Sequence, residues 1–143
     1  MKKEKVFWCI EPEVSGSLGD GTIMDSSIHP PKISKLNYEF SGWLQNDLIE
    51  SFPCFIVTEN LKNCIDKMNY SGVYFDEVQI TKSDEFKILY PKLELPKFFW
   101  MRINGLARED DFGLSNDYRL VVSNDVFNTF KHFNISEADF EEY

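Results

Sequence analysis

The sequence predicts a single α+β domain, residues 1–143, with a mixed or mainly antiparallel sheet and short helices. Short runs of β-branched and aromatic residues alternate with short helical stripes, and turn residues separate them. The length of 143 residues and the hydrophobic fraction of 43% fit one domain with a sizeable core. A strand–helix–strand pattern also occurs twice, as two similar units at residues 55–80 and 118–143.

The first unit, residues 55–80, starts with the apolar run FIV and continues into Thr58, a good helix N-cap. Residues 69–72 predict a turn, and residues 73–80 predict a second strand. Between the cap and the turn, apolar residues recur at the spacing of one buried helix stripe: Leu61, Cys64, Ile65 and Met68.

The second unit aligns with the first when the chain is shifted by 65 residues, which places Ser123 on Thr58. Both predicted helices are too short to be stable alone, so we expect each to pack on the sheet. Gly72 corresponds to Glu137, so the second turn cannot copy a conformation that needs glycine. The alternative is that the two stretches are unrelated units of a common kind.

Three further strands are predicted, at residues 5–10, 33–40 and 97–104, from apolar runs and alternation. Residues 11–31 predict a long loop that contains glycines, prolines and a short edge strand around Ile23. Residues 106–117 predict a polar loop.

Two short helices are also predicted outside the repeated units. The first covers residues 43–51, where Trp43, Leu44, Leu48 and Ile49 lie on one helical side. The second is capped by Ser83 and is expected to turn Phe86, Leu89 and Tyr90 inward. Residues 91–97 contain two prolines and predict a connector.

The net charge of −9 disfavours nonspecific nucleic-acid binding and favours a basic protein partner. An acidic surface that only maintains solubility is the alternative. No apolar run reaches the ~18 residues of a membrane span, and the N-terminal apolar run is too short for a secretory signal. We therefore expect a cytoplasmic protein without a membrane partner. The three cysteines lie in apolar runs and are expected to be buried, with no metal site.

Carboxylates cluster at several places and form the candidate contact surface for a basic partner. Solvated surface charge and a Mg²⁺ or acid–base pair are the alternatives. No motif indicates a catalytic site or a cofactor. The candidate contacts are Asp76, Glu77, Glu109, Asp110, Asp111, Asp117, Glu141, Glu142 and Tyr143.

A second candidate site lies in the 11–31 loop, where His29 follows Asp25 and Ser27. These residue types could form a ligand site or a catalytic group, but their proximity in sequence is weak evidence because such groups assemble across a fold. The alternative is a polar turn in which Asp25 or Ser27 bonds the backbone.

Several segments of the chain resemble immunity proteins of bacterial polymorphic toxin systems, the Imm11-like group with a DUF1629-type domain. The segments are FPCFIVTENL at 52–61, SGVYFDEV at 71–78, FFWMRING at 98–105, DDF at 110–112 and RLVVS at 119–123. The resemblance implies a protein without enzymatic activity that binds and neutralises a cognate toxin, and it carries over no site residues. A small-ligand-binding protein or enzyme that uses His29, and a generic interaction module, are the other hypotheses.

Overall fold

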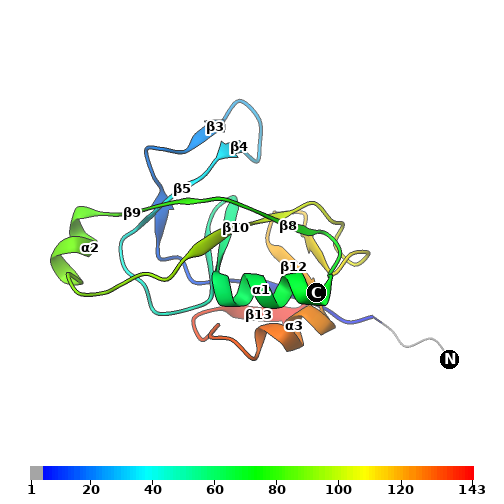
Figure 1. Ribbon diagram of the computed structural model, residues 1–143. Helices are drawn as coiled ribbons and strands as arrows, with labels where there is room; N and C mark the ends of the chain where they lie inside the picture. The colour runs from blue at the N-terminus through cyan, green and yellow to red at the C-terminus, as the bar shows by residue number, and fades with distance from the viewer. Residues whose placement is uncertain (1–4) are drawn as a thin grey trace.

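The computed structural model describes residues 5–143 and confirms a single α+β domain with mostly antiparallel sheets and three short helices (Figure 1). Sheet 1 has the strand order β11-β12-β1-β13, and sheet 2 has the order β6-β7-β10-β8. Sheet 1 contains β1 (Phe7–Glu11), β11 (Phe112–Leu114), β12 (Leu120–Ser123) and β13 (Asp139–Glu142). Sheet 2 contains β6 (Leu48–Ser51), β7 (Cys54–Thr58), β8 (Val73–Asp76) and β10 (Phe98–Ile103).

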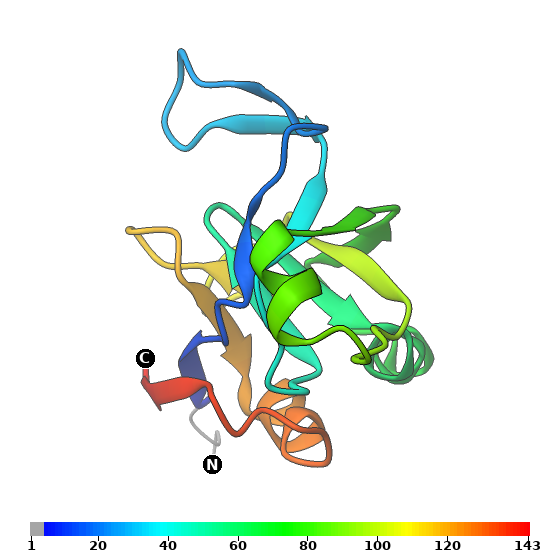
Figure 2. The ribbon, with the colours of Figure 1, turned by 90° about the vertical axis from the view of Figure 1, so that its left-hand side faces the viewer.

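Sheet 3 has the order β2-β5-β9, and its β5–β9 pair is parallel, so the architecture is mixed. Its strands are β2 (Gly16–Leu18), β5 (Asn37–Phe40) and β9 (Gln79–Lys82). A separate hairpin of β3 (Ile23–Asp25) and β4 (Lys32–Lys35) stands out from the body of the molecule (Figure 2).

Sheet 2 lies at the centre because its two faces belong to different hydrophobic clusters. Phe55 and Val57 pack with residues of sheet 1 and of the helices α1 (Glu59–Met68) and α3 (Asn124–Phe130). Cys54 and Ile56, on the opposite face of the same strand, pack with sheet 3 and with α2 (Asp84–Leu89). This alternation explains why β7 is apolar at every position up to its helix cap.

The two four-stranded sheets have the same connectivity. In sheet 2 the hairpin β6–β7 leads into α1, and β8 then pairs on the far side of β10. In sheet 1 the hairpin β11–β12 leads into α3, and β13 then pairs on the far side of β1. The predicted units at 55–80 and 118–143 therefore occupy equivalent places, and each encloses an antiparallel strand from elsewhere in the chain.

The helix caps of the two units are also equivalent. Thr58 Oγ1 accepts a hydrogen bond from the Leu61 N–H, and Ser123 Oγ accepts one from the Val126 N–H. The predicted cap at Ser83 is present as well and begins α2. Gly72 has a φ of +86°, which confirms that the turn after α1 depends on glycine.

The predicted helix at 43–51 is wrong. Residues 48–51 form β6, and residues 43–47 have no regular structure. The backbone here is bonded to distant groups instead of to its own turn: the Leu44 N–H donates to Glu13 Oε2, and the Asp47 N–H donates to the Asn134 carbonyl. Gln45 also has a positive φ of 66°, which a helix excludes.

Several predicted elements have different limits in the structure. The stretch 33–40 is divided between β4 and β5, and the stretch 73–80 is divided between β8 and β9, with each half in a different sheet. The loops 11–31 and 106–117 contain the short strands β2, β3 and β11. Of the residues expected to point inward, Phe86 is buried, whereas Met68, Leu89 and Tyr90 are exposed. Cys9 and Cys54 are buried and Cys64 is half-buried.

Candidate functional site: an acidic edge strand

Carboxylates are concentrated on β13, the last strand of sheet 1. One side of this strand pairs with β1, from Trp8 opposite Glu142 to Glu11 opposite Asp139. Its other side has no strand partner among residues 5–143. All four residues of β13 are exposed, and together with the residue two places before the strand they form what we call the acidic edge: Glu137, Asp139, Phe140, Glu141 and Glu142.

Phe140 is the apolar member of the acidic edge. Its ring lies 4.9 Å from that of Phe127 and 6.3 Å from that of Trp8, measured between centroids. These contacts hold the ring in place on the α3 side of the sheet, yet 52% of the residue remains exposed. An aromatic ring that is anchored and exposed, on a strand whose other residues are acidic, is typical of an interface with a charged rim.

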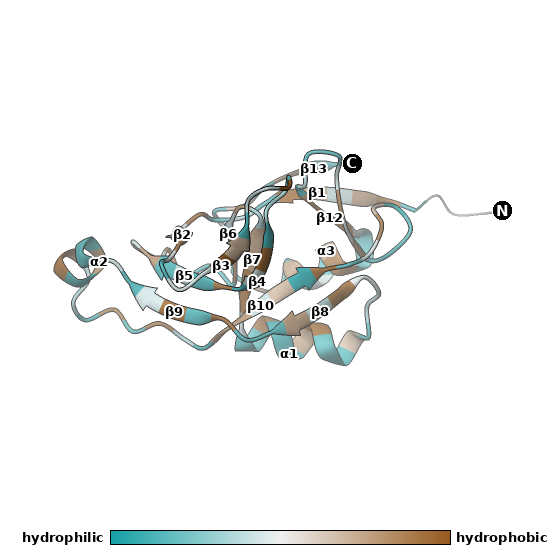
Figure 3. Cartoon of the chain, turned by 90° about the horizontal axis from the view of Figure 1, so that it is seen from above, coloured by the Kyte–Doolittle hydropathy of each residue, from teal (hydrophilic) through white to brown (hydrophobic). Residues whose placement is uncertain are grey.

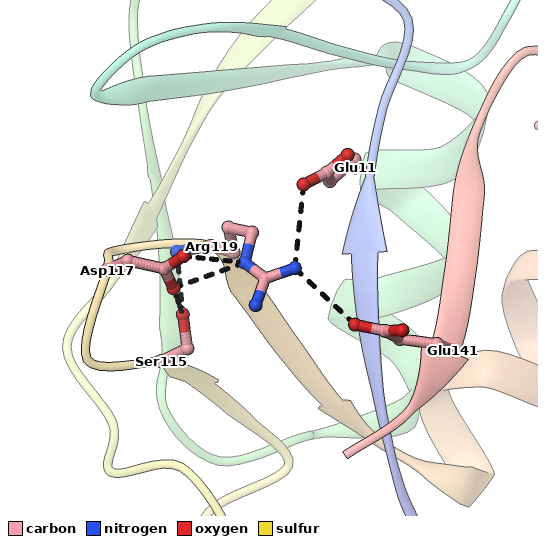
Figure 4. A network of polar contacts seen from close by, with 5 residues as sticks. All are labelled: Glu11, Ser115, Asp117, Arg119 and Glu141. Carbon is pink, nitrogen blue, oxygen red and sulfur yellow. Dashed lines mark hydrogen bonds and ion pairs between the residues drawn. The ribbon is translucent and has the colours of Figure 1, made fainter.

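Arg119 organises the neighbouring carboxylates (Figure 4). Its Nη1 lies 3.5 Å from Glu11 Oε1 and 3.5 Å from Glu141 Oε1, and its Nε lies 3.0 Å from Asp117 Oδ2. The hydrogen bond from Ser115 Oγ, followed by that from Arg119, lowers the pKa of Asp117. The bond to Asp117 raises the pKa of Arg119. One guanidinium thus touches three carboxylates, and Glu137, Asp139 and Glu142 add further negative charge.

Four of the predicted contacts lie at or next to the acidic edge. Glu141 and Glu142 belong to it, and Asp117 joins it through Arg119. Tyr143 follows directly, and its carbonyl accepts a hydrogen bond of 2.6 Å from Arg108 Nη2. The Arg108 guanidinium also lies 5.1 Å from the centre of the Tyr143 ring.

The predicted contacts at 109–111 have different roles. Glu109 is exposed, and Asp110 Oδ2 accepts a hydrogen bond of 2.8 Å from the Leu106 N–H. The Asp111 carboxylate is engaged at both oxygens, since Oδ1 accepts from Ser123 Oγ at 2.9 Å and Oδ2 from the Ser71 N–H at 3.1 Å. Asp111 therefore has a structural role.

Asp76 and Glu77 lie at the end of β8, on the opposite side of the molecule from β13 (Figure 3). Asp76 Oδ2 is 3.3 Å from Arg102 Nη1, and Asp76 Oδ1 accepts a hydrogen bond of 3.0 Å from the Glu77 N–H. The structure therefore does not bring these two residues onto one surface with Glu141 and Glu142.

The alternative site at Asp25, Ser27 and His29 lies in the exposed loop of the β3–β4 hairpin. Asp25 Oδ1 accepts hydrogen bonds from the Ser27 N–H at 2.9 Å and from Ser27 Oγ at 2.5 Å, and these bonds lower the pKa of Asp25. The His29 ring packs instead against Phe52 and Tyr118, with centroids at 6.1 and 5.6 Å. The geometry of Asp25 and Ser27 is that of a polar turn.

Sequence reasoning missed two groups of residues. The candidate contacts omitted Glu137, Asp139 and Phe140, although the alternation of acidic and aromatic residues in EADFEEY is a visible signal. The buried Glu13, only 5% exposed, was also missed; burial raises its pKa, and its Oε1 has no hydrogen-bond partner among the described residues. Burial, followed by the charge of Glu11, raises the pKa of Glu50 to about 7. Nothing in the local sequence indicates that Glu13 is buried or that Glu50 is half-buried.

Comparison with known proteins finds no family model that matches this chain, and no curated protein matches it. Within residues 5–143, His, Cys, Asp and Glu side chains do not form a group of three or more that could hold a metal ion. None of the described helices has the length and apolar character needed to cross a membrane.

Proposed function

We propose that this protein is an inhibitor that binds a basic partner protein through the acidic edge and neutralises it by occlusion. The mode of action would be that of a cytoplasmic immunity protein against its cognate bacterial toxin, without catalysis by the inhibitor. The observation that carries the proposal is an exposed edge strand on which an anchored phenylalanine is flanked along the strand by acidic residues.

Both the net charge of the protein and the carboxylates of the acidic edge favour a basic partner. A basic partner is attracted to the net charge of −9 as a whole, which increases the association rate. The acidic edge then supplies four exposed carboxylates, of which Glu141 is held in place by Arg119. Exposed charges contribute more to steering and specificity than to affinity, so the carboxylates alone would give a weak complex.

Phe140 would supply the affinity that the charges do not. A buried aromatic side chain contributes more to binding than rim charges do, because its burial removes a large apolar area from water. Phe140 is already fixed by Phe127 and Trp8, so binding would cost little side-chain entropy. The unpaired side of β13 lies beside it and offers backbone groups to the partner.

The direct experiment is co-expression with the protein encoded by the neighbouring gene, the candidate toxin. We expect a complex that survives purification and growth that is rescued from the toxin. Asp139→Lys/Glu142→Lys reverses two exposed charges of the acidic edge without removing a contact of Arg119 and should abolish rescue.

The matched control is Glu77→Lys/Glu94→Lys, which makes the same charge change at two exposed residues away from the acidic edge. This control should still rescue growth, because only the overall charge is altered. Absence of both a complex and rescue with the wild-type protein would overturn the proposal. Equal loss of rescue in the two double variants would show that the acidic edge is not the binding surface.

A further inference from the structure

A pocket of about 220 Å³ lies where the β3–β4 hairpin joins the body of the molecule. Its walls come from β4, β7, β8, β10 and β11, and from the turn before β12. Arg102 and Lys32 line it, and no aspartate or glutamate does. In a protein with a net charge of −9, a pocket lined by two cations and no carboxylate favours an anionic ligand.

Arg102 is held in a fixed position by its neighbours. Its guanidinium carbon lies 4.1 Å from the centre of the Trp100 ring and 5.4 Å from that of Tyr74. Its Nη1 lies 3.3 Å from Asp76 Oδ2. A guanidinium has five N–H donors, and Asp76 occupies one nitrogen, so donors remain for a planar anion.

The rest of the lining is aromatic and apolar. Trp100, Tyr74 and Tyr118 line the pocket together with three prolines, which give it rigid walls. The thiol of Cys54 also lines it and is buried, and burial raises its pKa to about 12, so it adds no negative charge. Flat apolar walls beside a fixed guanidinium suit a flat apolar group that carries a carboxylate.

We propose that this pocket binds a small aromatic carboxylate, with the carboxylate on Arg102 and Lys32 and the ring against Tyr74 and Tyr118, the more exposed aromatic residues of the lining. The size is suitable, because a cavity of about 150 Å³ already accommodates benzene. The site is separate from the acidic edge and requires no partner protein. Its failure and the failure of the proposed function are therefore independent.

The test is a ¹H–¹⁵N NMR titration of the full chain with sodium benzoate, the neutral analogue benzamide and inorganic phosphate. We expect saturable shifts with benzoate, centred on β10 and β4, with a Kd on the order of 1 mM for a ligand of this size. Benzamide and phosphate should bind at least about tenfold more weakly, because each lacks either the charge or the ring.

Arg102→Gln removes the guanidinium and should weaken benzoate binding by about tenfold or more. Arg108→Gln is the matched control, since Arg108 is an exposed cation that contacts Tyr143 and not the pocket. Far-ultraviolet circular dichroism and thermal melting would show that both variants are folded. If Arg102→Gln does not fold, Lys32→Gln replaces it, because Lys32 is exposed and its substitution should not disturb folding. Lys32→Gln should weaken benzoate binding measurably, but less than Arg102→Gln.

Three results would overturn the proposal. The first is an absence of saturable benzoate shifts up to about ten times the expected Kd. The second is equal affinity of the wild-type protein and a folded pocket variant. The third is equal affinity for benzoate and for benzamide or phosphate, which would remove the requirement for a carboxylate on a ring.

Discussion

Asp47 and Asp111 occupy equivalent positions in the two halves of the fold. Each precedes the first strand of a hairpin, and each accepts from the N-cap residue at the end of that hairpin: Asp47 from Thr58 Oγ1 at 2.7 Å, and Asp111 from Ser123 Oγ at 2.9 Å. The second oxygen of each carboxylate reaches the turn after the helix of the other half. It accepts from the Asn134 N–H at 2.8 Å and from the Ser71 N–H at 3.1 Å, respectively.

This reciprocal pair of bridges makes the two halves depend on each other. Each aspartate connects the start of the helix in its own half to the turn after the helix in the other half. Loss of either carboxylate should therefore destabilise both halves. The equivalence extends the similarity of the two units beyond residues 55–80 and 118–143, back to the hairpins that precede them. It also explains why a residue in an acidic loop, Asp111, serves the fold.

Asp111→Ala should lower the free energy of unfolding by about 2 kcal/mol, because hydrogen bonds to a charged group contribute about 1.5–3 kcal/mol. Asp47→Ala should have an effect of similar size. Glu109→Ala is the control, since Glu109 is exposed and two residues away, and it should be neutral. Urea unfolding measures all three; an Asp111→Ala variant as stable as Glu109→Ala would contradict the structural role.

Gly72→Ala should lower the free energy of unfolding by about 2 kcal/mol or more, because alanine is disfavoured at positive φ and close contacts add to the strain. Gly72 has a φ of +86°, and a Cβ there would lie 2.2 Å from the Phe112 carbonyl oxygen. Gly42→Ala is the matched control, since its Cβ would meet only Tyr90 Cε2, at 3.6 Å. Equal melting temperatures for the two variants would refute the packing described for this turn.

The stability of the protein should respond to the charge of Glu50. Burial raises the pKa of Glu50 to about 7 from an ordinary value of 4.5. Between these values the folded protein binds more protons than the unfolded chain, so the contribution of Glu50 to stability is present at low pH and is lost as the pH rises towards 7. Glu50→Gln should therefore stabilise the protein more at pH 8 than at pH 5.

Thermal melts of Glu50→Gln and the wild-type protein at both pH values measure this difference. Glu77→Gln is the control for the same change at an exposed carboxylate. A Glu50→Gln effect that does not change with pH, or that is larger at pH 5, would contradict the burial of this carboxyl.

Phe140→Ala should separate binding from folding. The lost aromatic contacts with Phe127 and Trp8 should cost about 1 kcal/mol of stability, and the affinity for the basic partner should fall by about tenfold or more. Ile88→Ala on α2 is the matched control, because Ile88 is an apolar residue that is 76% exposed and lies outside the acidic edge. Unchanged affinity in Phe140→Ala would exclude Phe140 as the anchor.

Local sequence patterns predicted the parts of the fold that local interactions determine. The caps at Thr58, Ser83 and Ser123 and the strands around them depend on neighbours within a few residues, so they are visible in the sequence. Residues 43–51 were predicted wrongly because Leu44 and Asp47 form their backbone bonds with Glu13 and Asn134, which are far away in sequence. Tertiary contacts of this kind override local propensity.

The candidate site was only partly predictable for a similar reason. Charge and composition indicated acidic contacts, and Glu141 and Glu142 lie on the acidic edge. Sequence could not show that Asp111 is engaged by Ser71 and Ser123, or that Asp76 and Glu77 lie on the opposite side of the molecule. Those distinctions depend on which strands become neighbours in the folded chain.

Binding through the acidic edge can be measured by calorimetric titration of the purified neighbouring-gene product into the wild-type protein and the two double variants. We expect binding by the wild-type protein and by Glu77→Lys/Glu94→Lys, and this binding should weaken at higher salt because exposed charges are screened. We expect an affinity at least about tenfold lower for Asp139→Lys/Glu142→Lys. Binding of equal strength by both double variants, or no binding by the wild-type protein, would contradict binding through the acidic edge.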